Sequence, residues 1–158
     1  MQSNDERGDW YWKVFSDRFK ASRPAVFKVA EYLNREKDCT VKIAKMELAP
    51  DKSVADKYKD FGDIIVNEKF IVEVKGKTVP FTNKEDFPWN EIIVANVASA
   101  DRHEVFAFFI VNPKMTHAAV IRGDTKNQWR KALIQDTFKG SIEEKYLCSI
   151  DLVEFVKL

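Results

Sequence analysis

The sequence predicts a mixed α/β or α+β fold in which helices cover both faces of a β-sheet. Three observations support this: a helical pattern of apolar residues near the N-terminus, a run of short β-like segments through the middle, and a second helical pattern followed by a strand near the C-terminus. The chain has 158 residues, of which 45% are hydrophobic and 32% are charged. These values fit one globular domain that is large enough to bury a core.

The N-terminal region is expected to divide into a tail and the start of the domain. Residues 1–9 are polar and offer nothing apolar to bury, so we expect them to be disordered. A single domain is then expected over residues 10–158. It should begin with a short helix in the aromatic-rich stretch from Trp10 to Phe19.

A longer helix is predicted from Ser22 to about Lys37. Ser22 can cap this helix, and Pro24 fits its first turn. Apolar side chains recur at helical spacing at Val26, Val29, Ala30 and Leu33. We therefore expect the helix to pack one face against the sheet.

The middle of the chain predicts strands. Residues 39–48 alternate apolar and polar side chains, as in a half-exposed strand. The stretch "GDIIVNEKFIVEVKGK", from Gly62 to Lys77, contains two short runs rich in Ile and Val and predicts a β-hairpin with its loop at residues 67–69. Further strands are expected at residues 91–97, 105–112 and 116–122.

The C-terminal region predicts one more helix and a closing strand. Asp124 or Thr125 can cap a helix that extends to about Phe138. The apolar stretch "YLCSIDLVEFV" then predicts a strand and a short final element. Two polar stretches that contain proline, residues 49–61 and 78–90, are expected to be loops.

Composition excludes several classes of protein. The formal net charge is +1, so any nucleic-acid contact must come from local clusters of basic residues. No run of about 18 apolar residues is present, and the first residues do not have the layout of a secretion signal, so we expect a cytoplasmic protein without a membrane partner. Cys39 and Cys148 are far apart and lack metal-binding spacing, which indicates free thiols, and His103 and His117 are equally isolated.

Charged residues interrupt the predicted hairpin in a regular way. With the loop at residues 67–69, Asp63 lies across from Glu73, and side chains directly opposite each other on paired strands share one face. Lys75 follows two residues after Glu73 and therefore points to the same face. The opposite, apolar face carries Ile64, Val72 and Val74.

The two carboxylates of the hairpin favour a bound metal ion, because ionised carboxylates this close repel each other unless a positive charge compensates them. Mg²⁺, or Mn²⁺ in its place, accepts carboxylate oxygens together with a backbone carbonyl such as that of Val74. Such an ion can acidify a bound water and neutralise charge on a phosphate, while Lys75 holds or activates the attacking water. The residue set therefore fits phosphodiester hydrolysis.

The pattern of Asp63, nine intervening residues and then Glu73-Val74-Lys75 resembles the PD-(D/E)xK nuclease superfamily. The resemblance extends from about Pro24 to Val120 and implies the restriction-endonuclease-like fold, a mixed β-sheet flanked by helices with the core order αβββαβ. It implies a DNA endonuclease in which Asp63, Glu73 and Lys75 are catalytic and in which Asp63, Glu73 and the Val74 carbonyl bind the metal. Members of the family often add a glutamate on the first helix, and Glu31 occupies the comparable place, so the resemblance implies that Glu31 is a further catalytic residue that completes the metal shell.

Two other short motifs compete with this assignment. Pro50-Asp51 is a literal Pro-Asp pair, but it lies in a predicted polar turn, whereas Asp63 opens a buried strand. Glu143-Glu144-Lys145 repeats the (D/E)xK triplet in a polar stretch where we expect no apolar strand and no partner aspartate. The hairpin is therefore the preferred site.

DNA is the partner that the resemblance implies. The basic residues expected to contact its phosphates are Lys69, Lys77, Lys84, Arg102, Arg122, Lys126 and Arg130. Polar residues that follow a predicted strand end and can face a substrate are Asn96, Ser99 and Arg102. Trp10, Trp12, Trp89 and Trp129 can stack on bases, although such residues more often pack in cores. No separate recognition domain is evident, so a homodimer or a targeting partner is expected.

Two other functions stay open at this point. One is a catalytically silent nucleic-acid-binding or protein-interaction module of the same fold, against which the joint presence of Asp63, Glu73 and Lys75 argues. The other is an unrelated α+β interaction domain. Restriction, repair, recombination and phage or mobile-element roles are all compatible with the resemblance.

Overall fold

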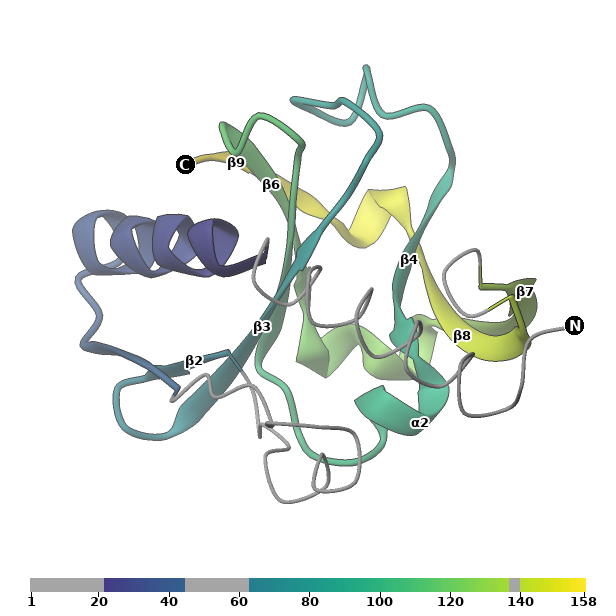
Figure 1. Ribbon diagram of the computed structural model, residues 1–158, viewed down its shortest axis with the longest axis horizontal. Coiled ribbons are helices and arrows are strands. Elements are labelled where there is room, and N and C mark those ends of the chain that lie inside the picture. Colours follow the sequence, from purple (N-terminus) through teal and green to yellow (C-terminus); the bar gives the residue numbers. More distant parts are fainter. Residues whose placement is uncertain (1–21, 45–62, 137–139) are drawn as a thin grey trace, which may run out of the picture.

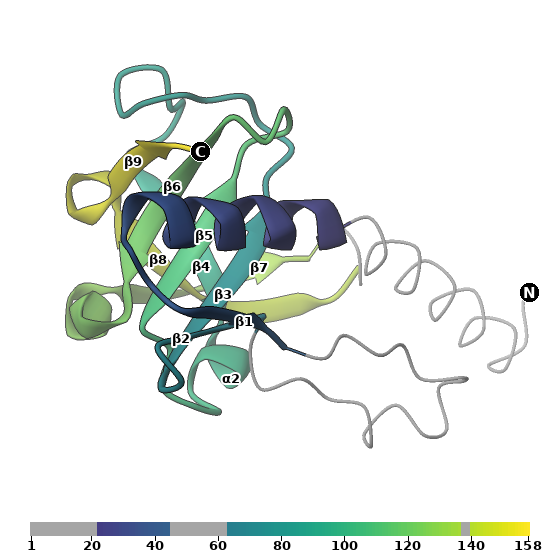
Figure 2. The same cartoon turned by 90° about the vertical axis from the view of Figure 1, so that its left-hand side faces the viewer.

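The computed structural model describes residues 22–44, 63–136 and 140–158. These residues build three layers, which are one helix, a six-stranded sheet and a three-stranded sheet (Figure 1 and Figure 2). The fold is mixed α/β, and most strand pairs are antiparallel. Predictions that lie outside the described residues concern residues 1–9, the helix from Trp10 to Phe19, the loop at residues 49–61 and the pair Pro50-Asp51.

The first layer is a helix over residues 22–36, which confirms the prediction for this segment. Its buried side chains are Ala25, Val26, Val29, Tyr32 and Leu33. They pack against one face of the six-stranded sheet, where the ring centroids of Tyr32 and Phe109 are 6.1 Å apart. Within the described ranges, no helix is long and apolar enough to cross a lipid bilayer.

The six-stranded sheet has the order β1-β2-β3-β5-β6-β9. Its strands are β1 (Val41–Ile43), β2 (Ile64–Val66), β3 (Phe70–Gly76), β5 (Ala107–Val111), β6 (His117–Arg122) and β9 (Glu154–Lys157). β3 and β5 run parallel, and the other described pairs in this sheet are antiparallel. The predicted hairpin is confirmed, because Val66 pairs with Phe70 across a turn at residues 67–69.

The parallel pairing of β3 with β5 requires a crossover connection. β4 (Glu91–Asn96) and the short helix α2 (Val97–Ala100) lie within it. β4 joins β7 (Arg130–Gln135) and β8 (Ile142–Ser149) in a second sheet of order β4-β8-β7. The 3-10 helix η3 (Ile150–Leu152) then leads from β8 to β9. The strands predicted at residues 91–97, 105–112 and 116–122 are confirmed as β4, β5 and β6.

The helix predicted between residues 124 and 138 is wrong. A 3-10 helix, η2, spans Gly123–Gln128, and β7 follows as an edge strand of the second sheet. Exposure alternates along the latter part of β7, with Ala132 and Ile134 half-buried, so pairing with β8 outweighs the helical propensity of the segment. The second face of the large sheet is therefore covered by strands instead of the predicted helix.

Two apolar cores lie on opposite faces of the large sheet. The core under the helix includes, from the hairpin, Ile64, Val66, Val72 and Val74. The core between the sheets includes, from β5 and β6, Phe108, Ile110, Ala119 and Ile121. Among the described residues, no side chain of β2 or β3 belongs to the core between the sheets. The three-stranded sheet therefore covers β5 and β6 and leaves that face of β3 at its margin.

Candidate active site

The charged side chains of β3 lie on the face turned away from the 22–36 helix. Val72 and Val74 are buried under that helix, so the pleat of the strand directs Glu73 and Lys75 to the opposite face. Both charged residues are half-buried, and each is paired with a residue of β5. They therefore sit at the margin of the core between the sheets.

Asp63 lies directly before β2 and keeps contact with β3. Its backbone N–H donates to the carbonyl oxygen of Val72 at 3.2 Å. Its carboxylate Oδ2 accepts a hydrogen bond from the backbone N–H of Val74 at 2.7 Å. Val72 and Val74 are two residues apart in β3, so their backbone groups point to the same neighbouring strand. The Asp63 carboxylate therefore accepts the hydrogen bond that a backbone carbonyl of a longer β2 would otherwise accept from Val74.

The carboxyl groups of Asp63 and Glu73 interact directly. Burial raises the pKa of Asp63 to about 6, and the hydrogen bond from Val74 opposes this rise. The charge of Glu73 and a hydrogen bond between the two carboxyl groups raise the pKa further, whereas the ammonium group of Lys75 lowers it. The structure thus brings together the three side chains that the sequence pattern singles out.

His103 is a neighbour of Glu73 that the sequence pattern does not reveal. Its Nε2 lies 3.4 Å from Oε1 of Glu73, and the two side chains are 19% and 23% exposed. Both ring nitrogens are buried and have no hydrogen-bond partner within the described ranges. The sequence pattern could not predict this contact directly. His103 lies in the loop before β5, and this loop is next to Glu73 because β5 pairs in parallel with β3. The imidazole therefore depends on Glu73 for polar contact.

No protein-family model, curated protein or solved structure matches this chain. The likeness to the PD-(D/E)xK pattern therefore rests on two features of the chain itself. One is the convergence of Asp63, Glu73 and Lys75, and the other is the order of the elements that carry them.

The donor atoms around Asp63 suit a small divalent cation. Two carboxyl groups are in contact, and the carbonyl of Val74 faces the same edge of β3 as the N–H group that bonds Asp63. Mg²⁺ is usually held by one or two carboxylates, with water in its other positions. In the described part of the chain, no group of three or more His, Cys, Asp and Glu side chains could hold a metal ion. The site therefore suits an ion that needs few protein ligands. Such an ion would relieve the repulsion between the carboxylates of Asp63 and Glu73.

The structure does not bring Glu31 to the acidic pair. Glu31 occupies an exposed position on the 22–36 helix, where its side chain is 64% exposed and lies 3.5 Å from Arg35 in an ion pair. That helix covers the face of the sheet opposite to Glu73. Glu31 therefore lacks the contact with the site that the resemblance implied.

A groove of about 480 Å³ opens beside Lys75. It lies between the end of β3, the strand β4 and the strand β8. Among the residues that line it are Lys77, Trp89, Asn96, Ser99 and Lys145. Asn96 and Ser99 are two of the polar residues that the sequence places after a strand end, where side chains can face a substrate. Lys75 is therefore one of the residues that line an open groove between the two sheets.

Several of the predicted phosphate-binding side chains are engaged by carboxylates. The pairs are Lys84 with Asp151, Arg122 with Asp124, and Arg130 with Glu91. Arg130 and Glu91 form a two-pronged contact in which both hydrogen bonds measure 2.7 Å. A cation that is already paired adds less to phosphate binding, so these residues are weaker candidates than the sequence implied.

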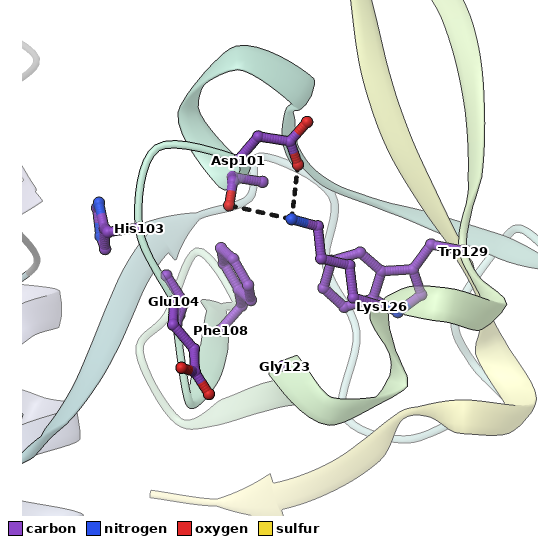
Figure 3. A pocket seen from close by; sticks show the side chains of 9 residues that line it. Asp101, His103, Glu104, Phe108, Gly123, Lys126 and Trp129 are labelled. Atoms are coloured by element: carbon purple, nitrogen blue, oxygen red, sulfur yellow. Dashed lines mark hydrogen bonds and ion pairs between the residues drawn. The ribbon is translucent and has the colours of Figure 1, made fainter.

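Lys126 is directed into a small cavity of about 300 Å³ (Figure 3). Its Nζ lies 2.6 Å from Oδ1 of Asp101 and 3.3 Å from the carbonyl oxygen of Ala100. The same ammonium group lies 5.3 Å from the ring centroid of Tyr146. In Figure 3, His103 lies on the other side of the cavity from Lys126. Lys126 therefore connects η2 to the end of α2 through these contacts.

The other predicted phosphate-binding residues are Lys69, Lys77 and Arg102. The ammonium groups of Lys69 and Lys77 lie over aromatic rings, at 5.4 Å from the centroid of Phe70 and 5.3 Å from that of Trp89. Arg102 is exposed in the turn after α2. Of these three residues, Lys77 lines the groove beside Lys75.

The second (D/E)xK triplet lies on β8 and has an aspartate next to it, so the expectation of no apolar strand and no partner aspartate is wrong. Lys145 lies 3.1 Å from Asp136 in an ion pair whose side chains are 14% and 15% exposed. Glu143 accepts a hydrogen bond from Nδ2 of Asn96 at 2.8 Å. These contacts join groups of opposite charge or neutral partners, whereas Asp63 and Glu73 face each other as like charges. The pair on the hairpin is therefore the better candidate for a metal.

The described cysteines are free thiols, as predicted, at Cys39 and Cys148. Cys148 is buried in the core between the sheets. Burial raises the pKa of Cys148 to about 11, so its thiolate form is scarce at neutral pH. Cys148 is therefore not a candidate nucleophile.

Proposed function

We propose that this chain is a metal-dependent endonuclease that hydrolyses phosphodiester bonds in DNA. One observation carries the proposal, which is that Asp63, Glu73 and Lys75 converge on the face of β3 that the second sheet leaves at its margin. Two like charges in a shared, partly buried site do not favour stability. Such arrangements cluster at functional sites, where a cation or a substrate compensates them.

The order of elements supports membership of the PD-(D/E)xK superfamily. A helix precedes β1, β2 and β3, and β5 then returns parallel to β3, which agrees with part of the core order αβββαβ. Asp63 and the triplet that begins at Glu73 are on adjacent strands, as in that family's pattern. The crossover departs from the pattern, because it contains β4 and the four-residue helix α2. A restriction-endonuclease-like core is therefore part of this proposal.

Each side chain has its own role in the proposed reaction. Asp63, Glu73 and the carbonyl of Val74 would hold Mg²⁺, for which Mn²⁺ can substitute, and the bound ion would polarise the scissile phosphate. Lys75 orients the attacking water and balances the negative charge that develops on the phosphate oxygens. His103 positions the Glu73 carboxylate through its contact at 3.4 Å.

DNA contact in this proposal begins at the groove, where Lys77 lies beside Lys75. Lys69 and Arg102 are the further candidates for phosphate contact, because the structure pairs the remaining predicted cations with carboxylates. We propose that a homodimer or a targeting partner supplies the rest of the DNA contact.

A cleavage panel tests the proposed function. Labelled duplex, flap, junction and single-stranded DNA, together with RNA, are incubated with the protein in Mg²⁺ or Mn²⁺, and at least one DNA should be cut only when metal is present. Lys75→Ala should slow cleavage by about 10²–10³-fold, because developing charge on the phosphate loses its partner. Circular dichroism checks that the fold is unchanged.

Lys84→Ala is the matched control for this experiment. It also removes a lysine ammonium group, but that group is paired with Asp151 and lies outside the acidic site. The control should cleave at the rate of the parent protein. If Lys75→Ala cuts as fast as the parent, the assigned chemistry is wrong.

A catalytically silent nucleic-acid-binding or protein-interaction module is the second candidate. It is favoured by the observation that, among the described residues, no cluster of three or more His, Cys, Asp and Glu side chains could hold a metal. The same panel separates the two candidates. Binding of DNA without cleavage of any substrate in Mn²⁺ would support the silent module.

A further inference from the structure

The groove beside Lys75 has features that hydrolysis alone does not require. Its volume of about 480 Å³ falls within the range of about 300–1,000 Å³ that is usual for ligand sites. Its walls come from the end of β3, from β4 with α2, and from β8. Lys75 lines the groove, and its charge also acts on Asp63, so one residue is shared by the groove and the acidic site.

The described lining of this groove carries an excess of positive charge. Its ammonium groups come from Lys75, Lys77 and Lys145, and its carboxylate comes from Asp136, which lies 3.1 Å from Lys145. Burial lowers the pKa of Lys77, and the nearby charge of Lys145 lowers it further. Ammonium groups that repel each other across a groove are stabilised by an anion placed between them. The phosphates of a nucleic-acid strand are such anions.

Trp89 gives the same groove an exposed aromatic surface. The residue is 51% exposed, although tryptophan is largely buried in most proteins. Its ring centroid lies 5.8 Å from that of Phe87, which belongs to the core between the sheets. The ammonium group of Lys77 lies 5.3 Å from the Trp89 centroid. An aromatic platform is therefore held next to a cation.

We propose that the groove binds an unpaired polynucleotide strand, with a base stacked on Trp89 and a neighbouring phosphate on Lys77. A basic track combined with an aromatic surface binds single strands without reading their sequence. In a duplex the base faces are stacked on one another, so they cannot reach Trp89. Cleavage of the bound strand next to Lys75 rests on the proposed function, whereas binding in the groove does not. It narrows the substrate class to single strands, flaps and other unpaired segments.

Binding measured without catalysis tests the groove separately from the reaction. The full chain is titrated in EDTA against a fluorescently labelled oligodeoxyuridylate, an oligouridylate of equal length and a blunt-ended DNA hairpin, with anisotropy as the readout. At least one single strand should bind more tightly than the hairpin. The tighter of the two single strands then identifies the sugar that the groove accepts.

Substitutions within the groove locate the bound strand. Trp89→Ala should weaken binding of the preferred strand by about 5- to 100-fold, since a stacked base is lost. Trp89→Phe keeps an aromatic ring and should restore most of the affinity. Phe106→Ala is the matched control, because Phe106 is 50% exposed but packs against Phe70 at the other end of β3. Lys77→Gln should reduce the log–log salt slope by about 0.7, the value for one phosphate contact on a single strand.

The outcomes separate this inference from the proposed function. Equal affinity of the parent and Trp89→Ala, or tighter binding of the hairpin than of both single strands, would overturn the groove proposal. If the groove variants behave as expected but nothing is cleaved in Mg²⁺ or Mn²⁺, the binding site stands and the nuclease proposal fails. If DNA is cleaved while Trp89→Ala binds as the parent does, the nuclease stands and the groove proposal fails.

Discussion

The two faces of β3 are built from alternate residues of one strand, yet they differ in chemistry. On the helix side, the strand pair is apolar and closed to water, with exposures of 0% for Ile64 and 1% for Val72. On the other side, Glu73 and Lys75 are half-buried at the margin of the second sheet, next to Asp63. The apolar face holds the strand in place, so the other face can keep like charges close together.

This difference means that stability and chemistry can be altered separately. A side chain removed from the apolar face should change the free energy of unfolding. A side chain removed from the charged face should change metal binding, pH dependence or cleavage while the fold persists.

Ile64→Ala should cause the largest loss of stability. It truncates a fully buried side chain and should lower the free energy of unfolding by about 2–5 kcal/mol. Ile65→Ala is the matched control, because Ile65 is the next residue of β2, points to the charged face and is half-buried. Urea denaturation followed by circular dichroism measures both variants. Equal losses would show that the two faces do not differ as described.

Asp63→Asn should change how stability depends on pH. The pKa of Asp63 is raised from 3.8 to about 6 in the folded protein, so the folded state holds this proton more tightly than the unfolded state does. In EDTA, the free energy of unfolding of the parent protein should therefore fall by on the order of 3 kcal/mol as pH rises from about 4 to 6. It should change little above that range. The variant lacks the titrating group and should not show this loss.

Chemical denaturation of both proteins between pH 4 and pH 7.5 measures the effect, with the difference between them as the readout. Mn²⁺ or Mg²⁺ should restore stability to the parent above about pH 6, because an ion that binds only the folded state stabilises it, and should do so much less for Asp63→Asn. A difference between parent and variant that is constant across this pH range would contradict the displaced pKa of Asp63.

His103→Ala should weaken Mn²⁺ binding by about 10-fold, since a side chain that orients a metal ligand typically contributes about 10- to 100-fold to metal affinity or activity. The reason is that the Glu73 carboxylate loses its contact at 3.4 Å. His103→Gln keeps a polar side chain that can contact Glu73 and should recover part of the Mn²⁺ affinity. Isothermal titration measures the Mn²⁺ affinity of each variant, and cleavage rates are measured in parallel.

His117→Gln is the control for this effect. His117 is also half-buried, but its Nδ1 contacts Oγ1 of Thr116, away from Glu73. The His117→Gln variant should bind Mn²⁺ as tightly as the parent protein does. Unchanged Mn²⁺ affinity in His103→Ala would remove His103 from the site, whereas equal losses in the histidine variants would point to a general loss of structure.

Local patterns of residues were sufficient to predict the helix over residues 22–36, the hairpin and the strands β4, β5 and β6. These elements follow from local signals, which are the periodicity of apolar residues and the turn at residues 67–69. The register of the hairpin also placed Glu73 and Lys75 on one face, because the alternation of side chains along a strand is a local property. The proximity of the two carboxyl groups could therefore be predicted from the sequence without knowledge of the whole fold.

The surroundings of that pair depend on how distant segments of the chain pack together. The segment after Gln128 became β7 instead of a helix because β8 was available to pair with it. Parallel pairing of β3 with β5 brought His103 to Glu73, and packing of the helix left Glu31 exposed. The groove beside Lys75 and the carboxylate partners of several cations also join segments distant in the sequence. Contacts of this kind depend on how whole elements pack, and no local pattern of residues encodes them.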